Sequence, residues 1–240
     1  MKKCKVVTRH GIGVDSIDVE VATEHKICIV NVPEYCIDEV SDYAFALALA
    51  CVRKVVMLDS TVKKGKWDFK ISAPVFRLRN MKLGLVRFGN IARIVSRRLQ
   101  AFSLSVLAHD PYISPSIMTQ NTVRKVNLEE LLAEADIVSL HLPLTKDTKY
   151  MFTDKEFKLM KDTAFLVNTG RGPLNKEKDL CKALSERWIA GAGLAVAEKE
   201  PIDPNSDLLN LENVTITPHV AFYSEESLKD LQRSAARLFL

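Results

Sequence analysis

The amino-acid sequence predicts an α/β protein organised around a doubly wound parallel sheet. Short apolar runs alternate along most of the chain with segments whose apolar residues recur at helical spacing, which is the pattern of βαβ units. The run at residues 83–88 is apolar at nearly every position, as in a strand that is buried on both faces. With 240 residues, of which 47% are hydrophobic, the chain can bury a substantial core.

Residues 82–110 form the clearest βαβ unit. A tight turn follows the apolar run at 83–88, and a second apolar run at 104–109 stops at Asp110. Between them, apolar residues recur at helical spacing: Ile91, Ile94, Val95, Leu99 and Phe102.

This unit has some features of a dinucleotide site. In such a site a glycine turn aims the free N–H groups of the helix at the pyrophosphate, and an acidic residue after the second strand binds the ribose hydroxyls. Asp110 stands in that second position, and it favours NAD over NADP because a carboxylate would repel a 2′-phosphate. Gly89 and Ala92 fit the glycine fingerprint, but Arg87 replaces its first glycine. A βαβ unit that binds no cofactor is the alternative.

The flanking segments complete the predicted sheet. A strand at 4–8, a helix capped by Ser16 or Asp18 and a strand at 27–31 come before Val32-Pro33, which marks a domain crossing. The chain therefore opens on a strand with little before it, which suggests a fragment or a shortened relative of a larger protein. Beyond the central unit we expect strands at 122–126, 137–141, 164–168, 190–196 and 214–217, and helices at 128–133, 154–160 and 176–187.

A single long helix is predicted over residues 38–64, closed by Gly65. Asp38, Glu39 and Asp42 lie in its first turns, where the helix dipole favours them. Residues 43–52 are apolar nearly all round, so this part must be buried on several faces. We expect the helix to form a subunit contact, and the protein to be a homodimer.

Charge and cysteine content narrow the class of protein. The net charge of +4 is mild, and the basic clusters fall at helix-like positions, so a solvated face is favoured over a nucleic-acid surface. Five cysteines without metal-ligand spacing predict reduced, buried thiols, no metal site and a cytoplasmic protein. Neither a signal peptide nor an apolar run long enough to cross a membrane is visible.

Three chemically versatile side chains each follow a predicted strand. Arg171, Glu200 and His219 come after the strands at 164–168, 190–196 and 214–217, so they are expected at one edge of the sheet. Taken singly, Arg171 also fits a surface charge, Glu200 a loop carboxylate and His219 a structural histidine. Together they are the set that reduces a 2-oxo acid: a guanidinium clamps the carboxylate and an imidazolium, paired with a carboxylate, supplies a proton.

Eight short motifs, in the order in which they occur, resemble the D-isomer-specific 2-hydroxyacid dehydrogenases, the group of phosphoglycerate, glycerate and D-lactate dehydrogenases. The ending at 219–226 is most similar to the branch that includes the C-terminal-binding corepressor proteins. The motifs are GVDSID (13–18), NVP (31–33), GxxxFGNIA (84–92), HDPY (109–112), HLPLTKDT (141–148), LVNTGRG (166–172), EKEP (198–201) and TPHVAFYSEE (217–226).

The resemblance implies a Rossmann NAD-binding domain over residues 33–218 and a partial flavodoxin-like substrate domain made of 1–32 with 219–240. It implies that Arg171 clamps the substrate, His219 is the acid/base and Glu200 its partner, and that Gly11 and Ile12 meet the substrate carboxylate. Relatives would start earlier and run on beyond Leu240. The implied NAD contacts are Gly89, Asn90, Ile91, Asp110, Leu142, Pro143, Thr148, Thr169, Gly170 and Arg171.

Several positions depart from the pattern of that family. Arg87 replaces a fingerprint glycine, and Ala195 stands where relatives carry an aspartate that binds the nicotinamide carboxamide; Pro173 and Asn175 also differ. The first hypothesis is that the chain is an NAD-dependent oxidoreductase acting on a small 2-hydroxy acid. The alternatives are a weakly active or non-catalytic NAD-sensing or scaffolding protein and a truncated inactive relative.

Overall fold

The fold is that of a computed structural model and is described for residues 4–237. The chain divides into two compact units. The smaller one comprises the described residues up to Glu39 together with those from Phe222 onward, and the larger one comprises Val40–Ala221.

The smaller unit is built on two parallel strands. Strand β1 (Val6–Arg9) pairs with β2 (Cys28–Asn31), with Val6 opposite Cys28, and helix α1 (Val19–Glu24) connects them. The side chain of Asp18 caps α1 by accepting the N–H of Val21 at 2.9 Å. Helix α9 (Glu225–Arg237), which the sequence analysis did not predict, packs Leu231 and Ala235 against Val32. The two compact units divide between Glu39 and Val40, inside the helix Ile37–Val52.

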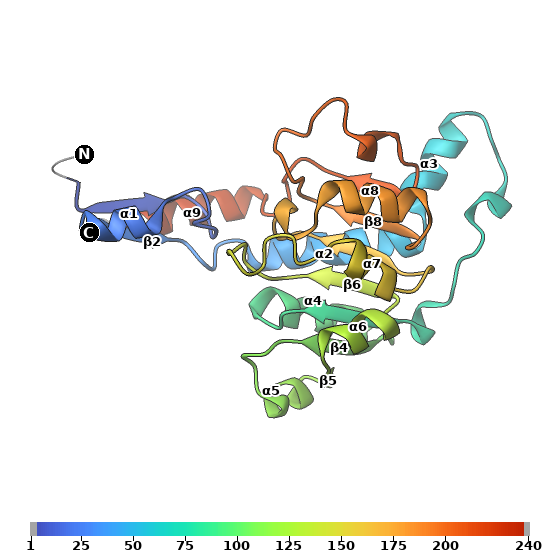
Figure 1. The fold of residues 1–240 in the computed structure, drawn as a ribbon, viewed down its shortest axis with the longest axis horizontal. Helices are drawn as coiled ribbons and strands as arrows, with labels where there is room; N and C mark the ends of the chain where they lie inside the picture. Colours follow the sequence, from blue (N-terminus) through green and yellow to red (C-terminus); the bar gives the residue numbers. More distant parts are fainter. Residues whose placement is uncertain (1–3, 238–240) are drawn as a thin grey trace. The chain divides into compact units, whose positions relative to one another are not determined.

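Within the described residues the larger unit contains one seven-stranded parallel sheet (Figure 1). Numbered along the unit, the strands lie in the order 3-2-1-4-5-6-7, so the doubly wound parallel sheet is confirmed, and its direction of winding switches between β3 and β6. In spatial order the strands are β5 (Val123–Lys125), β4 (Ser105–His109), β3 (Lys82–Val86), β6 (Ile137–Leu140), β7 (Phe165–Asn168), β8 (Gly191–Leu194) and β9 (Val214–Ile216).

Helices cover both faces of this sheet. On β8, Gly193 lies against Leu47 and Cys51 of α2, while its neighbours Ala192 and Leu194 belong to the core on the other face, where α8 packs. Figure 1 shows α7 and α8 in front of the strands and α2 behind them. The helices are α2 (Ile37–Val52), α3 (Val55–Lys63), α4 (Asn90–Gln100), α5 (Pro115–Gln120), α6 (Leu128–Glu134), α7 (Asp154–Leu159) and α8 (Glu177–Ser185), with 3₁₀ turns at Phe69–Ser72, Leu78–Asn80, Gly172–Leu174 and Asp207–Asn210.

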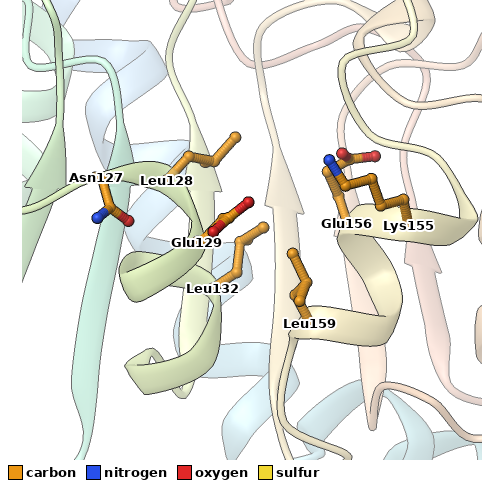
Figure 2. A pocket seen from close by; sticks show the side chains of 7 residues that line it. All are labelled: Asn127, Leu128, Glu129, Leu132, Lys155, Glu156 and Leu159. Carbon is orange, nitrogen blue, oxygen red and sulfur yellow. The ribbon is translucent and has the colours of Figure 1, made fainter.

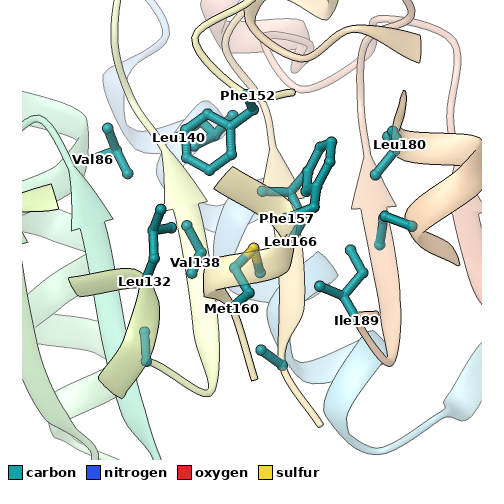
Figure 3. Packing of buried hydrophobic residues seen from close by; sticks show 14 of the residues in the cluster. Val86, Leu132, Val138, Leu140, Phe152, Phe157, Met160, Leu166, Leu180 and Ile189 are labelled. Carbon is teal, nitrogen blue, oxygen red and sulfur yellow. The ribbon is translucent and has the colours of Figure 1, made fainter. Parts of the chain in front are cut away.

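The main core lies between the sheet and helices α6, α7 and α8 (Figure 3). Strand residues such as Val138, Leu140 and Leu166 meet Phe157 and Leu180 from the helices. Since these side chains are almost completely buried, the strands are fixed in register by apolar packing on this face.

The prediction of one helix over residues 38–64 is wrong. The helix stops at Val52, and α3 starts at Val55 after Lys54, which adopts a left-handed conformation with φ of +54°. The apolar run 43–52 buries Ala44, Leu47 and Ala48, and Leu47 lies against Gly193 of the sheet, whereas α3 has no buried residue. A turn is needed here because the two segments meet different surroundings.

The structure differs from the sequence prediction at one short helix and at the cysteines. Helix α5 was not predicted, although Ser114 caps it and Pro115 is its first residue. All five cysteines are free thiols, but only Cys36 and Cys51 are buried, and Cys28 is exposed.

Among the described residues, no helix combines the length and apolar character that crossing a membrane requires.

Gly84 on β3 is a glycine that packing requires. A Cβ there would lie 2.6 Å from Leu131 Cδ2 on α6 and 2.8 Å from Cβ of Ala135, the residue that ends α6, whereas a Cβ at Gly89 meets nothing within 4 Å. We expect Gly84→Ala to lower the free energy of unfolding by roughly 1–3 kcal/mol, and Gly89→Ala to change it by less than about 0.5 kcal/mol. Urea unfolding measures both, and equal losses would contradict this account of the interface between α6 and β3.

Candidate active site and dinucleotide crevice

The three side chains singled out from the sequence follow three neighbouring strands. Arg171 comes after β7, Glu200 after β8 and His219 after β9, and these strands are adjacent and parallel. Their carboxyl ends therefore open on the same edge of the sheet.

Glu200 and His219 contact each other directly. The Nδ1 atom of His219 lies 2.6 Å from Oε2 of Glu200, and the other carboxylate oxygen, Oε1, accepts the N–H of Ala197 at 3.1 Å. His219 has a left-handed backbone with φ of +47°, a conformation that costs a non-glycine residue free energy and is frequent at functional sites. The carboxylate is thus held by the chain and in turn orients the imidazole.

A close backbone contact brings the loop of Arg171 against the loop of Glu200. A Cβ on Gly172 would lie only 1.8 Å from the carbonyl oxygen of Ala197, so only glycine fits there. The buried Asn168 fixes the same loop: its Nδ2 donates to the carbonyl of Arg171 at 2.9 Å, and its Oδ1 accepts the N–H of Gly170 at 3.0 Å. Asn168 could not be singled out from the sequence, since nothing in the spacing shows that its amide faces its own loop.

Arg171 itself is half-buried. Its Nη1 donates to the carbonyl oxygen of Gly170 at 2.8 Å, so the guanidinium is folded back along its own loop. The prediction that Arg171 binds the substrate rests on the position of its loop beside the loop of Glu200.

The turn after β3 leads into a helix whose N-terminus has no side-chain cap. Gly89 is the N-cap of α4, Asn90 and Ile91 are its first residues, and Gly89 and Asn90 are exposed. The first N–H groups of a helix have no partner within the helix, and a residue without a Cβ leaves space above them. This turn lies at the point where the sheet changes its winding direction.

Asp110, directly after β4, is buried with 5% of its surface exposed. Its Oδ2 accepts the N–H of Phe88 at 2.9 Å, and its Oδ1 accepts the N–H of Tyr112 at 2.9 Å and a 3.3 Å bond from Nη1 of Arg87. Burial alone would raise the pKa of Asp110, but the two backbone N–H groups and the Arg87 guanidinium hold it below its usual value. Asp110 is therefore ionised at neutral pH.

The loops that follow β6 and β7 contact each other. A Cβ at Gly170 would lie 3.4 Å from the carbonyl oxygen of Leu142, and Oγ1 of Thr148 donates to the carbonyl of Pro143 at 2.7 Å. Thr169 has a buried hydroxyl for which the described residues provide no hydrogen-bond partner. Such a group commonly binds a ligand or an ordered water.

These residues fit a dinucleotide. Uncapped N–H groups with space above Gly89, an ionised carboxylate after β4 and the unpartnered Thr169 hydroxyl all occur along one sheet edge. Ala195, after β8, is completely buried and offers no polar side chain at its position.

Gly11 and Ile12 lie in the loop after β1, in the smaller unit. Gly11 has φ of +141°, and its carbonyl accepts the N–H of Val32 at 3.2 Å, while Nδ2 of Asn31 donates to the carbonyl of Ile12 at 2.7 Å. The loop is thus held by the end of β2.

The hollow between α6 and α7 is a different feature (Figure 2). It measures about 280 Å³, and none of the residues discussed above lines it. It is lined by Asn127, Leu128, Glu129, Leu132, Lys155, Glu156 and Leu159.

Fold and sheet edge together define the class: the larger unit is an NAD-binding domain of the Rossmann type. The family profile for the "D-isomer specific 2-hydroxyacid dehydrogenase, NAD binding domain" matches residues 45–221. The chain belongs to this family of D-isomer-specific 2-hydroxyacid dehydrogenases, as the motifs in the sequence indicated.

The names of similar proteins refer to different acids. A glyoxylate reductase of Korarchaeum cryptofilum is 41% identical over 228 residues, which are 94% of this chain and 69% of that protein. A D-3-phosphoglycerate dehydrogenase of Archaeoglobus fulgidus is 37% identical over 94% of this chain and 43% of its own length. The crystal structure of an Aquifex aeolicus D-lactate dehydrogenase, complexed with NAD and lactic acid, superposes with a TM-score of 0.90 at 29% identity, covering 98% of this chain and 75% of that one.

His141, the first residue after β6, makes stability depend on pH. Burial lowers its pKa from 6.5 to about 4, so the unfolded chain takes up the proton before the folded protein does. We expect stability to be lost as the pH falls from about 6.5 toward 4, with His141 contributing roughly 3 kcal/mol of that loss. Urea unfolding across this range should show a shallower pH dependence for His141→Gln than for the wild type. Parallel curves for wild type and His141→Gln would contradict it.

Proposed function

We propose that the protein is an NAD-dependent oxidoreductase that interconverts a small D-2-hydroxy acid and its 2-oxo acid. The observation that carries the proposal is the 2.6 Å contact between His219 and Glu200, at the sheet edge that also carries Arg171 and the dinucleotide turn. Membership of the dehydrogenase family supports it.

Each side chain has a distinct role in this proposal. Arg171 binds the substrate carboxylate through parallel hydrogen bonds and polarises the adjacent carbonyl group. NADH, when bound, supplies the hydride that reaches the carbonyl carbon. His219 gives its Nε2 proton to the carbonyl oxygen, and Glu200 stabilises the imidazolium through Nδ1. One hydride and one proton convert the 2-oxo acid into the 2-hydroxy acid, and the reverse reaction returns both.

We propose that residues predicted from the sequence hold the cofactor. The N–H groups of Asn90 and Ile91 would bind the pyrophosphate, and Asp110 the adenosine ribose. The Thr169 hydroxyl and the loop from Leu142 to Thr148 would line the nicotinamide side. The smaller unit would act as the substrate domain, with Gly11 and Ile12 meeting the substrate carboxylate.

NADH oxidation with glyoxylate, hydroxypyruvate or pyruvate tests the activity. We expect turnover with at least one of these acids. His219→Ala should lower kcat by about 10²–10⁴-fold and Glu200→Gln by at least about tenfold, because the general acid or its partner is lost. Glu212→Gln, which changes an exposed carboxylate just before β9, is the matched control and should leave kcat unchanged. Turnover that survives His219→Ala would overturn the proposed chemistry.

A second candidate function is an NAD-sensing or scaffolding protein without catalysis. Two observations favour it over full activity: Ala195 is buried and apolar, and Arg87 occupies the dinucleotide turn. NADH binding by calorimetry, without turnover of any of the three acids, would support this function over the first.

We also propose that the protein is a homodimer, formed through α3 and the segment after it. Within residues 55–76 many large apolar side chains are exposed, Trp67 by 89% and Phe69 by 81% of their surface. A contiguous stretch of this kind marks an interaction surface, and a second copy of the chain can cover it symmetrically. The exposed apolar residues are Val55, Val56, Val62, Trp67, Phe69, Ile71, Val75 and Phe76.

Light scattering on purified protein should give the mass of two chains. The double substitution Trp67→Ser with Phe69→Ser should shift the mass to one chain without unfolding it, because neither side chain is buried within the chain. Tyr223→Ser, an exposed aromatic residue of the smaller unit, should leave the dimer intact. A monomeric wild type would refute the dimer.

A further inference from the structure

Arg87 and Asp110 follow neighbouring strands and meet across the dinucleotide turn. Arg87 comes directly after β3 with φ of +76°, and its N–H donates to the carbonyl of His109 at 2.8 Å. Its guanidinium donates to Asp110 at 3.3 Å and lies 4.3 Å from the ring centroid of Tyr112. With 22% of the side chain exposed, the guanidinium is held at the mouth of the turn and still meets solvent.

Asp110 is well supplied with hydrogen-bond donors. Both of its oxygens accept backbone N–H groups, and the Arg87 cation compensates its charge. A carboxylate at this position would by itself repel a 2′-phosphate on the adenosine ribose. Here that repulsion is offset, because the phosphate would meet the guanidinium together with the carboxylate.

A second guanidinium lies on the same turn. Nε of Arg93, on α4, donates to the carbonyl of Phe88 at 3.2 Å, and Phe88 is the residue whose N–H binds Asp110. Two guanidinium groups and one carboxylate are therefore fixed on this turn, Arg87 by Asp110 and Arg93 by the Phe88 carbonyl, and these three charges sum to a positive one. Arginine is the side chain best suited to phosphate, and one that is stacked on an aromatic ring is already oriented to bind it.

We propose that Arg87 sets the cofactor specificity of this site: it cancels the rejection of the 2′-phosphate expected from Asp110, so that the chain binds NADPH about as well as NADH. The 2′-phosphate lies against the face of Arg87 that is exposed to solvent, while the Tyr112 ring supports the guanidinium from its other side. This inference rests on the proposed function, because it deepens the account of the same dinucleotide crevice.

Calorimetric titration of the full chain with NADH and with NADPH tests the specificity without relying on turnover. We expect the two dissociation constants to agree within about tenfold. Adenosine 2′,5′-bisphosphate and adenosine 5′-monophosphate differ only in the 2′-phosphate, so they repeat the comparison without the nicotinamide end. The dissociation constants of the bisphosphate and the monophosphate should likewise agree within about tenfold.

Arg87→Met keeps the length of the side chain and removes its charge. We expect Arg87→Met to shift the preference toward NADH by at least about tenfold. The control is Arg97→Met, which changes an exposed arginine on α4 and should leave the preference unchanged. The ratio of the two dissociation constants is compared within each variant, so a general loss of affinity cancels. Arg87→Lys keeps the charge and should retain most of the NADPH binding if the methionine variant does not fold.

The outcomes separate this inference from the proposed function. NADH binding with NADPH weaker by more than about tenfold in the wild type overturns the role of Arg87 alone. So does a ratio that Arg87→Met leaves unchanged. A chain that binds neither dinucleotide overturns both the inference and the NAD-dependent function.

Discussion

The close approach of Gly172 to the backbone of Ala197 is the constraint on which the candidate active site depends. A side chain at Gly172 would overlap the carbonyl of Ala197, so the loops after β7 and β8 can meet only because a glycine is there. Ala197 in turn donates to Glu200, and Glu200 binds His219. A single backbone contact thus links the loop of Arg171 to the acid/base pair, whereas the parallel sheet alone would only bring the three loops to the same edge.

Much of the larger unit could be predicted from the sequence, because its strands are buried on both faces. The runs at β3, β6 and β7 are apolar at nearly every position, and such runs leave little ambiguity about where a strand lies. The break between α2 and α3 could not be predicted in the same way. Residues 37–63 are helix-compatible throughout, and the turn at Lys54 exists because α2 packs on the sheet while α3 leaves it. Tertiary contacts determined that break, and local propensity carries no record of them.

The residues of the candidate site could be predicted where they follow strands, but the residues that hold the loops in place could not. Arg171, Glu200 and His219 could be placed at one edge because strand ends can be located from the pattern. Asn168 and Ala197 could not, since the first acts through an amide turned toward its own loop and the second through a backbone N–H. Supporting contacts of this kind depend on backbone geometry at the loops, and a sequence specifies that geometry only through the whole fold.

Arg87 shows why an incomplete motif need not mean a damaged site. The residue takes the left-handed conformation that a glycine would take easily, at a cost of roughly 1–2 kcal/mol for a residue with a side chain. The side chain offsets part of that cost through its ion pair with the buried Asp110 and its contact with the Tyr112 ring, which a glycine could not make. The turn is therefore ordered by contacts with residues that lie some twenty positions further along the chain. A fingerprint compares residues only with their immediate neighbours, so the substitution looks like a loss in the sequence and is a different construction of the same turn in three dimensions.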